Sequence, residues 1–170
     1  MRPSSVMEGK NRQWSVPWRH WLLAAAVVMT CANSRANSLS DEQAQLLADL
    51  SAEQTQFADI AMRIWNYAEV GYQEHQSSRL LQETLKTAGF EVEAGLAGMP
   101  TAFVASYGQG EPVIGILAEF DALPGLSQAA LPQRKIIEHQ RAGHACGHHL
   151  FGAGSTAAAI AVSSWLAKRD

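Results

Sequence analysis

The stretch PVIGILAEFDALPGL, residues 112–126, begins as an apolar run and then places two acidic residues within three positions. The run over 112–120 is apolar until Glu119 and lies between glycine and proline residues, a pattern that predicts a strand buried on both faces. The acidic residues Glu119 and Asp121 come only where this strand would end. Because ligands in open α/β sheets bind at the carboxyl ends of strands, the stretch predicts a functional site there.

Two further β-rich runs precede this stretch. They are FEVEAG at 90–95 and TAFVASYG at 101–108, and glycine and proline residues separate them. Both contain the β-branched and aromatic residues that strands favour. Three predicted strands in sequence, with helical patterns on either side, indicate a domain that contains both helices and strands.

Helical patterns flank the predicted strands. Ser40 and Gln43 form a capping-box pattern, and apolar residues continue from there at helical spacing to about Trp65. A second helix is expected over 77–89, which ends in a glycine. A third is expected over 152–169, where the alanine-rich sequence GAGSTAAAIAVSSWLAKR indicates a buried helix packed closely on the sheet.

Composition restricts the class of protein. A length of 170 residues, with 47% hydrophobic and 17% charged residues, fits one modest globular domain and not a disordered chain. The formal net charge is −3, and no patch rich in lysine and arginine occurs beyond residue 20. We therefore expect no nucleic acid among the partners of the protein.

The first 36 residues have the pattern of an export signal. Basic residues dominate the first 20 positions, and the apolar run WLLAAAVVM follows at 21–29. This run is shorter than the roughly 20 residues that a membrane-spanning helix needs, so we expect no stable membrane span. The sequence therefore predicts a signal peptide over 1–36, a mature chain over 37–170 and a periplasmic location.

Small residues offer two cleavage positions, after Ala32 and after Ala36. An uncleaved N-terminal anchor is an alternative interpretation. Lipidation of Cys31 is another, although Met29 and Thr30 stand where small residues would be expected before a lipidated cysteine.

The sequence GHACGHHLFGAG, residues 143–154, places three histidines and a cysteine within six positions. Cys146 would be the only cysteine after signal removal, so no internal disulfide could form. In an extended segment His144, Cys146 and His148 would point to one side and His149 to the other. The helix expected to begin just after them would favour a thiolate, so Cys146 and His148 could share one cation.

Two other interpretations of these residues stay open on chemistry alone. The histidines could cap the helix while the cysteine fills a small pocket, and this structural interpretation is as well supported as a metal site. A cysteine nucleophile activated by His148 is a third hypothesis, but neighbours two positions apart rarely reach the attack geometry and no orienting acid is evident.

The sequence LAEFDALPGL (117–126) followed by GHACGHHLFGAG resembles the paired signature of the M20 metallopeptidase and amidohydrolase family, in the branch with a cysteine in its metal motif. The stretch WNYAEVGYQEHQSSRLLQETLKTAGFEVE (65–93) is similar to the opening helices of that family and of its aminobenzoyl-glutamate hydrolase subgroup. The resemblance covers about residues 45–166. It implies the N-terminal part of a zinc-peptidase-like, three-layer α/β domain with a mixed sheet.

The resemblance also implies roles for individual residues. Cys146 and His148 correspond to metal ligands, and Glu119 corresponds to an acid that orients the site from the strand end. Asp121 is expected to form a turn by hydrogen-bonding its own backbone, not to bind metal directly. His144 matches a family histidine to which we assign no metal.

Two further histidines complete the set. His139 has no counterpart in the family pattern and is expected to be a solvated loop residue. Many relatives carry aspartate or asparagine where this chain has His149. An imidazole thus replaces the carboxylate that would raise the basicity of the ligand His148.

The activity implied by the resemblance is hydrolysis of amide bonds in N-acyl or N-aroyl amino acids, such as aminobenzoyl-glutamate, or in small peptides. It would use two divalent cations, zinc or manganese, and full-length relatives are expected to form homo- or heterodimers. The family's catalytic glutamate and later ligands lie beyond the cysteine motif, so we expect a truncated, inactive chain. The alternative is a non-catalytic, exported module that binds metal or a partner.

Overall fold

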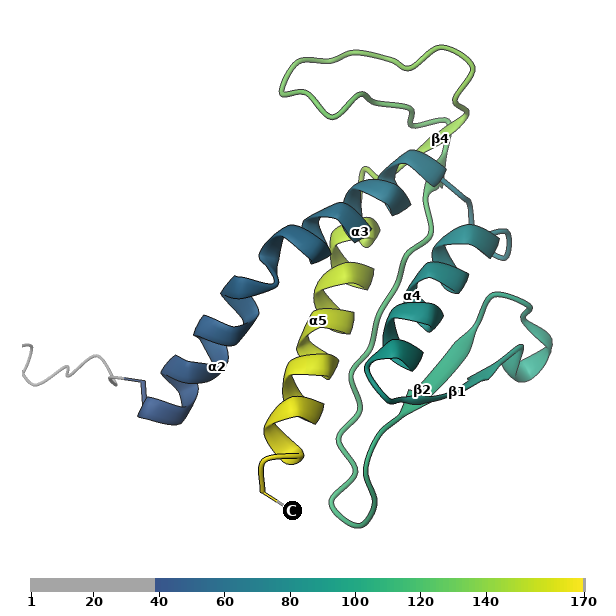
Figure 1. The fold of residues 1–170 in the computed structure, drawn as a ribbon. Coiled ribbons are helices and arrows are strands. Elements are labelled where there is room, and N and C mark those ends of the chain that lie inside the picture. Colours follow the sequence, from purple (N-terminus) through teal and green to yellow (C-terminus); the bar gives the residue numbers. More distant parts are fainter. Residues whose placement is uncertain (1–38, 170) are drawn as a thin grey trace, which may run out of the picture. The chain divides into compact units, whose positions relative to one another are not determined.

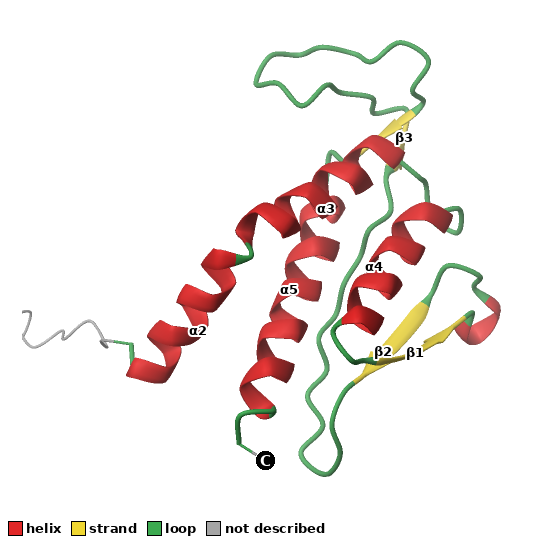
Figure 2. Cartoon of the chain, in the orientation of Figure 1, coloured by secondary structure: helices red, strands yellow, loops and turns green. Residues whose placement is uncertain are grey.

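The computed structural model describes residues 39–169 (Figures 1 and 2). The predicted signal peptide over 1–36, with its cleavage positions and Cys31, lies outside these residues. Within the described part of the chain, no helix combines the length and the apolar character needed to cross a membrane.

Helix α2 (Asp41–Ala52) begins at the predicted capping box. The Gln43 N–H donates to Ser40 Oγ at 3.2 Å, and the Ser40 N–H donates to Gln43 Oε1 at 2.9 Å. Each side chain thus satisfies a backbone N–H that the start of a helix leaves without a partner. This part of the sequence prediction is confirmed.

Helix α3 (Gln54–Tyr67) is separate from α2, although the sequence predicts one helix to about Trp65. The break falls at Glu53, whose φ of −92° and ψ of 1° leave the helical region. The apolar spacing continues across this residue, and a periodicity argument therefore cannot detect the break. The buried residues of α3 follow helical spacing and are Phe57, Ile60, Ala61 and Ile64.

Helix α4 (His75–Thr87) begins two residues before the range predicted for it, and Gly89 follows with a positive φ of 90°. Helix α5 (His148–Leu166) begins earlier than its predicted range, because both His148 and His149 belong to its first turn. Its buried face is made mostly of small residues, including Gly152 and Ala153.

The core lies where α3, α4 and α5 meet. Close packing is needed at Gly152, since a Cβ there would lie 3.1 Å from the Glu119 carbonyl oxygen and 3.3 Å from Leu81 Cδ1. The small residues of α5 therefore let the extended segment that contains Glu119 pass between α5 and α4, as Figure 1 shows. The buried residues of this core are Phe57, Ile60, Ala61, Ile64, Leu80, Leu81, Ala153 and Ala157.

Two antiparallel hairpins form among the described residues. Strand β1 (Glu91–Ala94) pairs with β2 (Phe103–Ser106), and the 3₁₀ turn η1 (Leu96–Gly98) lies between them. Strand β3 (Leu123–Pro124) pairs with β4 (Ala142–Gly143). The first hairpin confirms two of the predicted strands, and the mixture of helices and strands confirms the α/β class.

The third predicted strand is wrong in two respects. Residues 113–120 are extended but lie in no strand, and no backbone–backbone hydrogen bond joins them to any other described residue. The segment is also not buried on both faces, since Val113 and Ile114 are 78% and 75% exposed. A strand requires a neighbouring backbone, and within 39–169 β1 and β2 pair with each other instead.

Candidate metal centre

Two carboxylates stand at the end of the extended segment. Glu119 and Asp121 are two positions apart, and the next residue, Ala122, is 2% exposed. The Ala122 N–H donates to the Glu69 carbonyl oxygen at 2.7 Å, and Ala122 also forms a parallel bridge with Val70. The backbone that follows the two acids is therefore held to the turn after α3.

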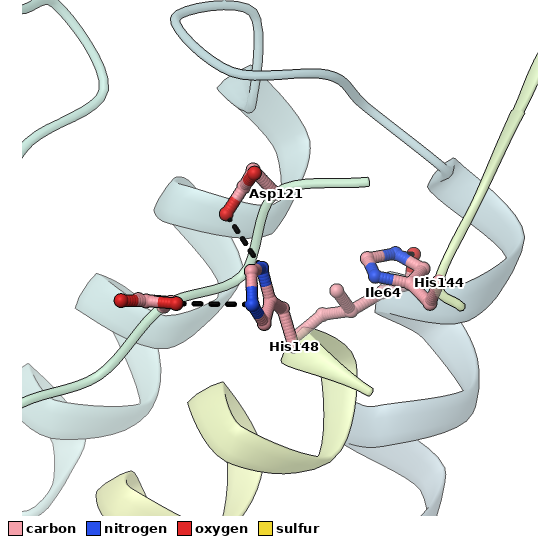
Figure 3. A network of polar contacts seen from close by, with 5 residues as sticks. Ile64, Asp121, His144 and His148 are labelled. Carbon is pink, nitrogen blue, oxygen red and sulfur yellow. Dashed lines mark hydrogen bonds and ion pairs between the residues drawn. The ribbon is translucent and has the colours of Figure 1, made fainter. Parts of the chain in front are cut away.

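His148 is the first residue of α5, and its imidazole lies between the two carboxylates (Figure 3). Its Nδ1 atom is 2.8 Å from Asp121 Oδ1, and its Nε2 atom is 3.0 Å from Glu119 Oε2. The side chain is 22% exposed, compared with 48% for Glu119 and 33% for Asp121. The cluster is thus open to small molecules on the Glu119 side.

These contacts fit a cation. A neutral imidazole carries one N–H, so it can donate to only one carboxylate. At the other short N···O contact two acceptor atoms would face each other unless a proton or a cation lies between them. Protonation of the ring or a metal ion at that position would each meet this requirement. One ligand atom from each of Glu119, Asp121 and His148 lies within 4.8 Å of the others, and nitrogen and oxygen donors of this kind suit zinc.

The contact made by Asp121 differs from the sequence expectation. A hydrogen bond to its own backbone is predicted for the aspartate, but its oxygen lies beside His148 Nδ1, 27 positions later in the chain. Glu119 contacts the same imidazole, so both acids can orient it. The turn motif around Asp121 favoured a local hydrogen bond and gave no indication of this contact. Its position two residues after Glu119 does indicate it, because residues two apart in an extended segment point to the same side.

Cys146 lies outside this cluster. Its side chain is exposed, and the group of ligand atoms within 4.8 Å of one another does not include its sulfur. The predicted pairing of Cys146 with His148 requires an extended segment, but Gly147 has a φ of 79° and turns the chain directly into α5. The ligand role of Cys146 stays a prediction, as does that of His148.

His144 and His149 are buried beside the cluster and not in it. The His144 Nε2 atom is 3.1 Å from the Ile64 carbonyl oxygen (Figure 3). The His149 ring packs edge-on against Trp65, with 4.8 Å between centroids, and lies 5.0 Å from the His144 ring. His139 is exposed in the loop before β4, as predicted.

Burial controls the protonation of the two inner histidines. It lowers the pKa of His149 to about 4, and the neighbouring His144 adds to this effect. Burial also lowers the pKa of His144, although its contact with the Ile64 carbonyl acts in the opposite direction. Both imidazoles are therefore neutral at pH 7, and they serve to pack the motif against α3.

Comparison with known proteins identifies relatives. No family model matches the chain. It is 44% identical over 118 residues to a subunit of the p-aminobenzoyl-glutamate hydrolase of Escherichia coli (strain K12). The aligned region covers 69% of this chain and 24% of the relative. The chain is 36% identical over 91 residues to thermostable carboxypeptidase 1 of Saccharolobus solfataricus, which covers 52% and 22%. Identity to hippurate hydrolase of Campylobacter jejuni is 28% over 125 residues, which covers 74% and 31%.

The matched region is a limited part of each relative, since the chain spans between 22% and 31% of their lengths. The names of these relatives describe hydrolases of aminobenzoyl-glutamate and of hippurate, and a carboxypeptidase. The two motifs that build the cluster, at 117–126 and 143–154, are those that resemble a family signature. With these relatives, they show that the chain belongs to the M20 family of metallopeptidases and amidohydrolases.

Proposed function

We propose that this chain carries part of the metal centre of an M20 hydrolase that cleaves the amide bond of N-acyl or N-aroyl amino acids or small peptides. The observation that carries the proposal is the imidazole of His148 between the carboxylates of Glu119 and Asp121. Similarity to hydrolases of aminobenzoyl-glutamate and hippurate supports the substrate class.

Each residue of the cluster has a distinct task. Asp121 Oδ1 lies 2.8 Å from His148 Nδ1, so it would accept the Nδ1–H, fix the ring orientation and the tautomer, and leave the Nε2 lone pair free for the cation. His148 Nε2 and Glu119 Oε2, which lie 3.0 Å apart, would then be the atoms that hold the cation. Carboxylate–histidine–metal arrangements of this kind raise the basicity of the ligand nitrogen.

A bound zinc or manganese ion would polarise the amide carbonyl and lower the pKa of a water molecule towards about 7. The exposed side of Glu119 gives a small substrate access to this position. We propose two cations in a complete centre, as the family resemblance implies. Cys146, which lies two residues before His148, would contribute a thiolate after a rearrangement at Gly147.

A chimera tests the proposal. The 118-residue aligned region of the Escherichia coli relative is replaced by the corresponding residues of this chain. The chimera is produced with any other subunit of the natural assembly. We expect metal-dependent release of aminobenzoate from aminobenzoyl-glutamate, and the same chimera with His148→Ala should show none.

The result also separates the two hypotheses drawn from the sequence. A folded chimera that binds zinc but cleaves none of aminobenzoyl-glutamate, hippurate and a panel of dipeptides would contradict the proposed hydrolysis. It would instead favour a module that binds metal without catalysing a reaction. A chimera that neither binds metal nor cleaves would contradict the metal centre itself.

A further inference from the structure

We infer that Glu69 is a positioning residue for the metal centre: it joins the start of α4 to the backbone that carries Asp121. The inference rests on the proposed function, because it concerns the same cluster. Glu69 lies in the turn after α3, and its side chain makes no hydrogen bond or ion pair with the three cluster side chains. Its effect on the cluster is therefore transmitted through the main chain.

The side chain of Glu69 caps helix α4. Its Oε2 atom accepts hydrogen bonds from the Ser77 N–H at 2.9 Å and from Ser77 Oγ at 2.8 Å. Its Oε1 atom accepts one from the Gln76 N–H at 2.9 Å. Glu74, the residue at the N-cap position, makes no side-chain capping bond. A carboxylate from outside the helix thus satisfies the free N–H groups and interacts favourably with the helix dipole.

The main chain of Glu69 holds the cluster. Its carbonyl oxygen accepts the Ala122 N–H at 2.7 Å, and the neighbouring Val70 pairs with Ala122 in a parallel bridge. Ala122 directly follows Asp121, whose carboxylate lies 2.8 Å from His148 Nδ1. One residue therefore fixes both the helix start and the end of the extended segment.

Removing the carboxylate would break the end of this link that holds α4, and it would loosen the turn whose main chain holds Ala122. Ser77 is fully buried, so the loss would leave its N–H and hydroxyl without a partner in a place that water does not reach. The turn at 68–70 would then relax, and Asp121 would move with Ala122. Because metal sites need their ligands and orienting groups placed within about 0.5 Å, a small shift would weaken metal binding.

The test uses the full chain and the metal ion itself. Zinc affinity is measured by calorimetry, and the visible absorption of bound Co²⁺ reports the geometry of the site. We expect Glu69→Ala to weaken zinc binding by about tenfold or more and to change the Co²⁺ spectrum. Loss of a residue that supports metal ligands commonly has an effect of this size. Glu69→Gln keeps one acceptor oxygen, so it should show a smaller change in the same direction.

Glu74→Gln is the matched control. It removes the same charge at the same helix end. In the wild-type chain the buried Glu74 carboxylate accepts a hydrogen bond from Thr101 Oγ1 at 2.6 Å, and the main chain of Glu74 makes no hydrogen bond to Ala122. It should lower the unfolding midpoint and leave the Co²⁺ spectrum unchanged. A folded Glu69→Gln chain with wild-type affinity and spectrum would overturn the inference, and so would equal spectral changes in both variants.

A metal-free measurement separates this inference from the proposed function. The side-chain ¹⁵N chemical shifts of His148 report its tautomer and its hydrogen bond to Asp121. Glu69→Gln should change these shifts and Glu74→Gln should not. If the wild-type chain bound no metal, the proposed centre would fail, while these shifts would still decide whether Glu69 positions the imidazole.

Discussion

The Nε2 atom of His144 lies 3.1 Å from the carbonyl oxygen of Ile64, although 80 positions separate the two residues. Ile64 is fully buried in α3. This contact therefore holds the start of the histidine-rich motif to the centre of the core. His148 follows four residues later, as the first residue of α5.

Acid should destabilise the fold before its carboxylates are protonated. Burial holds the pKa of His149 at about 4, below the ordinary value of 6.5, so the unfolded chain binds a proton first as the pH falls. Its contribution to stability is complete above pH 6.5 and is lost as the pH falls from 6.5 towards 4. We expect the free energy of unfolding to fall by up to about 1.4 kcal/mol per pH unit in this range.

Urea titrations at pH 7.5, 6 and 5 would measure this dependence. His149→Phe preserves an aromatic ring beside Trp65 and removes the titrating group, so its unfolding midpoint should vary less with pH. A wild-type midpoint that stays constant from pH 7 to pH 5 would show that His149 is not buried in its neutral form.

The two predicted ligands should respond differently to the choice of metal. His148→Ala removes the imidazole at the centre of the cluster and should abolish binding of both zinc and manganese. Cys146→Ala should weaken zinc binding strongly and manganese binding little, because thiolates favour zinc and oxygen donors favour manganese. Equilibrium dialysis with each metal measures both effects.

His139→Ala provides the control for these ligand variants, since this residue is exposed in a loop. It should leave both affinities unchanged. If Cys146→Ala left the zinc affinity unchanged, the cysteine would not be a ligand. Its exposed position would then be the one it keeps when metal is bound.

Gly143→Ala should destabilise the second hairpin. A Cβ at this position would overlap the Leu126 carbonyl oxygen, so the backbone would have to move and β4 would lose its register with β3. We expect a cost of about 1–3 kcal/mol, as for other overpacked sites. Gly154→Ala is the control, because a Cβ at that position would have no neighbour within 4 Å. On the exposed side of α5, alanine should stabilise the helix by up to about 1 kcal/mol.

Export can be tested on the protein produced in cells. The basic segment and the short apolar run predict cleavage after Ala32 or Ala36. Mass spectrometry of the periplasmic fraction should therefore find a chain that begins at Asn33 or Asn37. Recovery of a chain with residues 1–30 intact would instead favour the N-terminal anchor.

Features set by neighbouring residues could be predicted from the sequence. The capping box at Ser40, the hairpin of β1 and β2, and helix α4 all follow from residues a few positions apart. In each case the residue pattern and the backbone it stabilises lie in the same segment. The histidine-rich motif was likewise recognisable as a candidate chemical site from its residue types and spacing.

Features that depend on distant partners could not be predicted in this way. Residues 113–117 have the composition of a buried strand, but strand formation depends on a second backbone that their own sequence does not specify. The contact between Asp121 and His148 spans 27 positions. The turn at Gly147 separates Cys146 from the cluster, and no periodicity argument includes such a turn.

Helix α2 contains no fully buried residue, although Leu50 packs partly against the core. Its exposed ion pairs, Asp49–Lys168 and Glu42–Arg169, join it to the residues that follow α5 and contribute little in water. The free energy of the local opening that lets the amide hydrogens of α2 exchange with solvent should therefore be smaller than that for α3. None of the cluster residues Glu119, Asp121 and His148 lies in α2, so a local opening of this helix leaves the residues of the metal centre in the packed part of the chain.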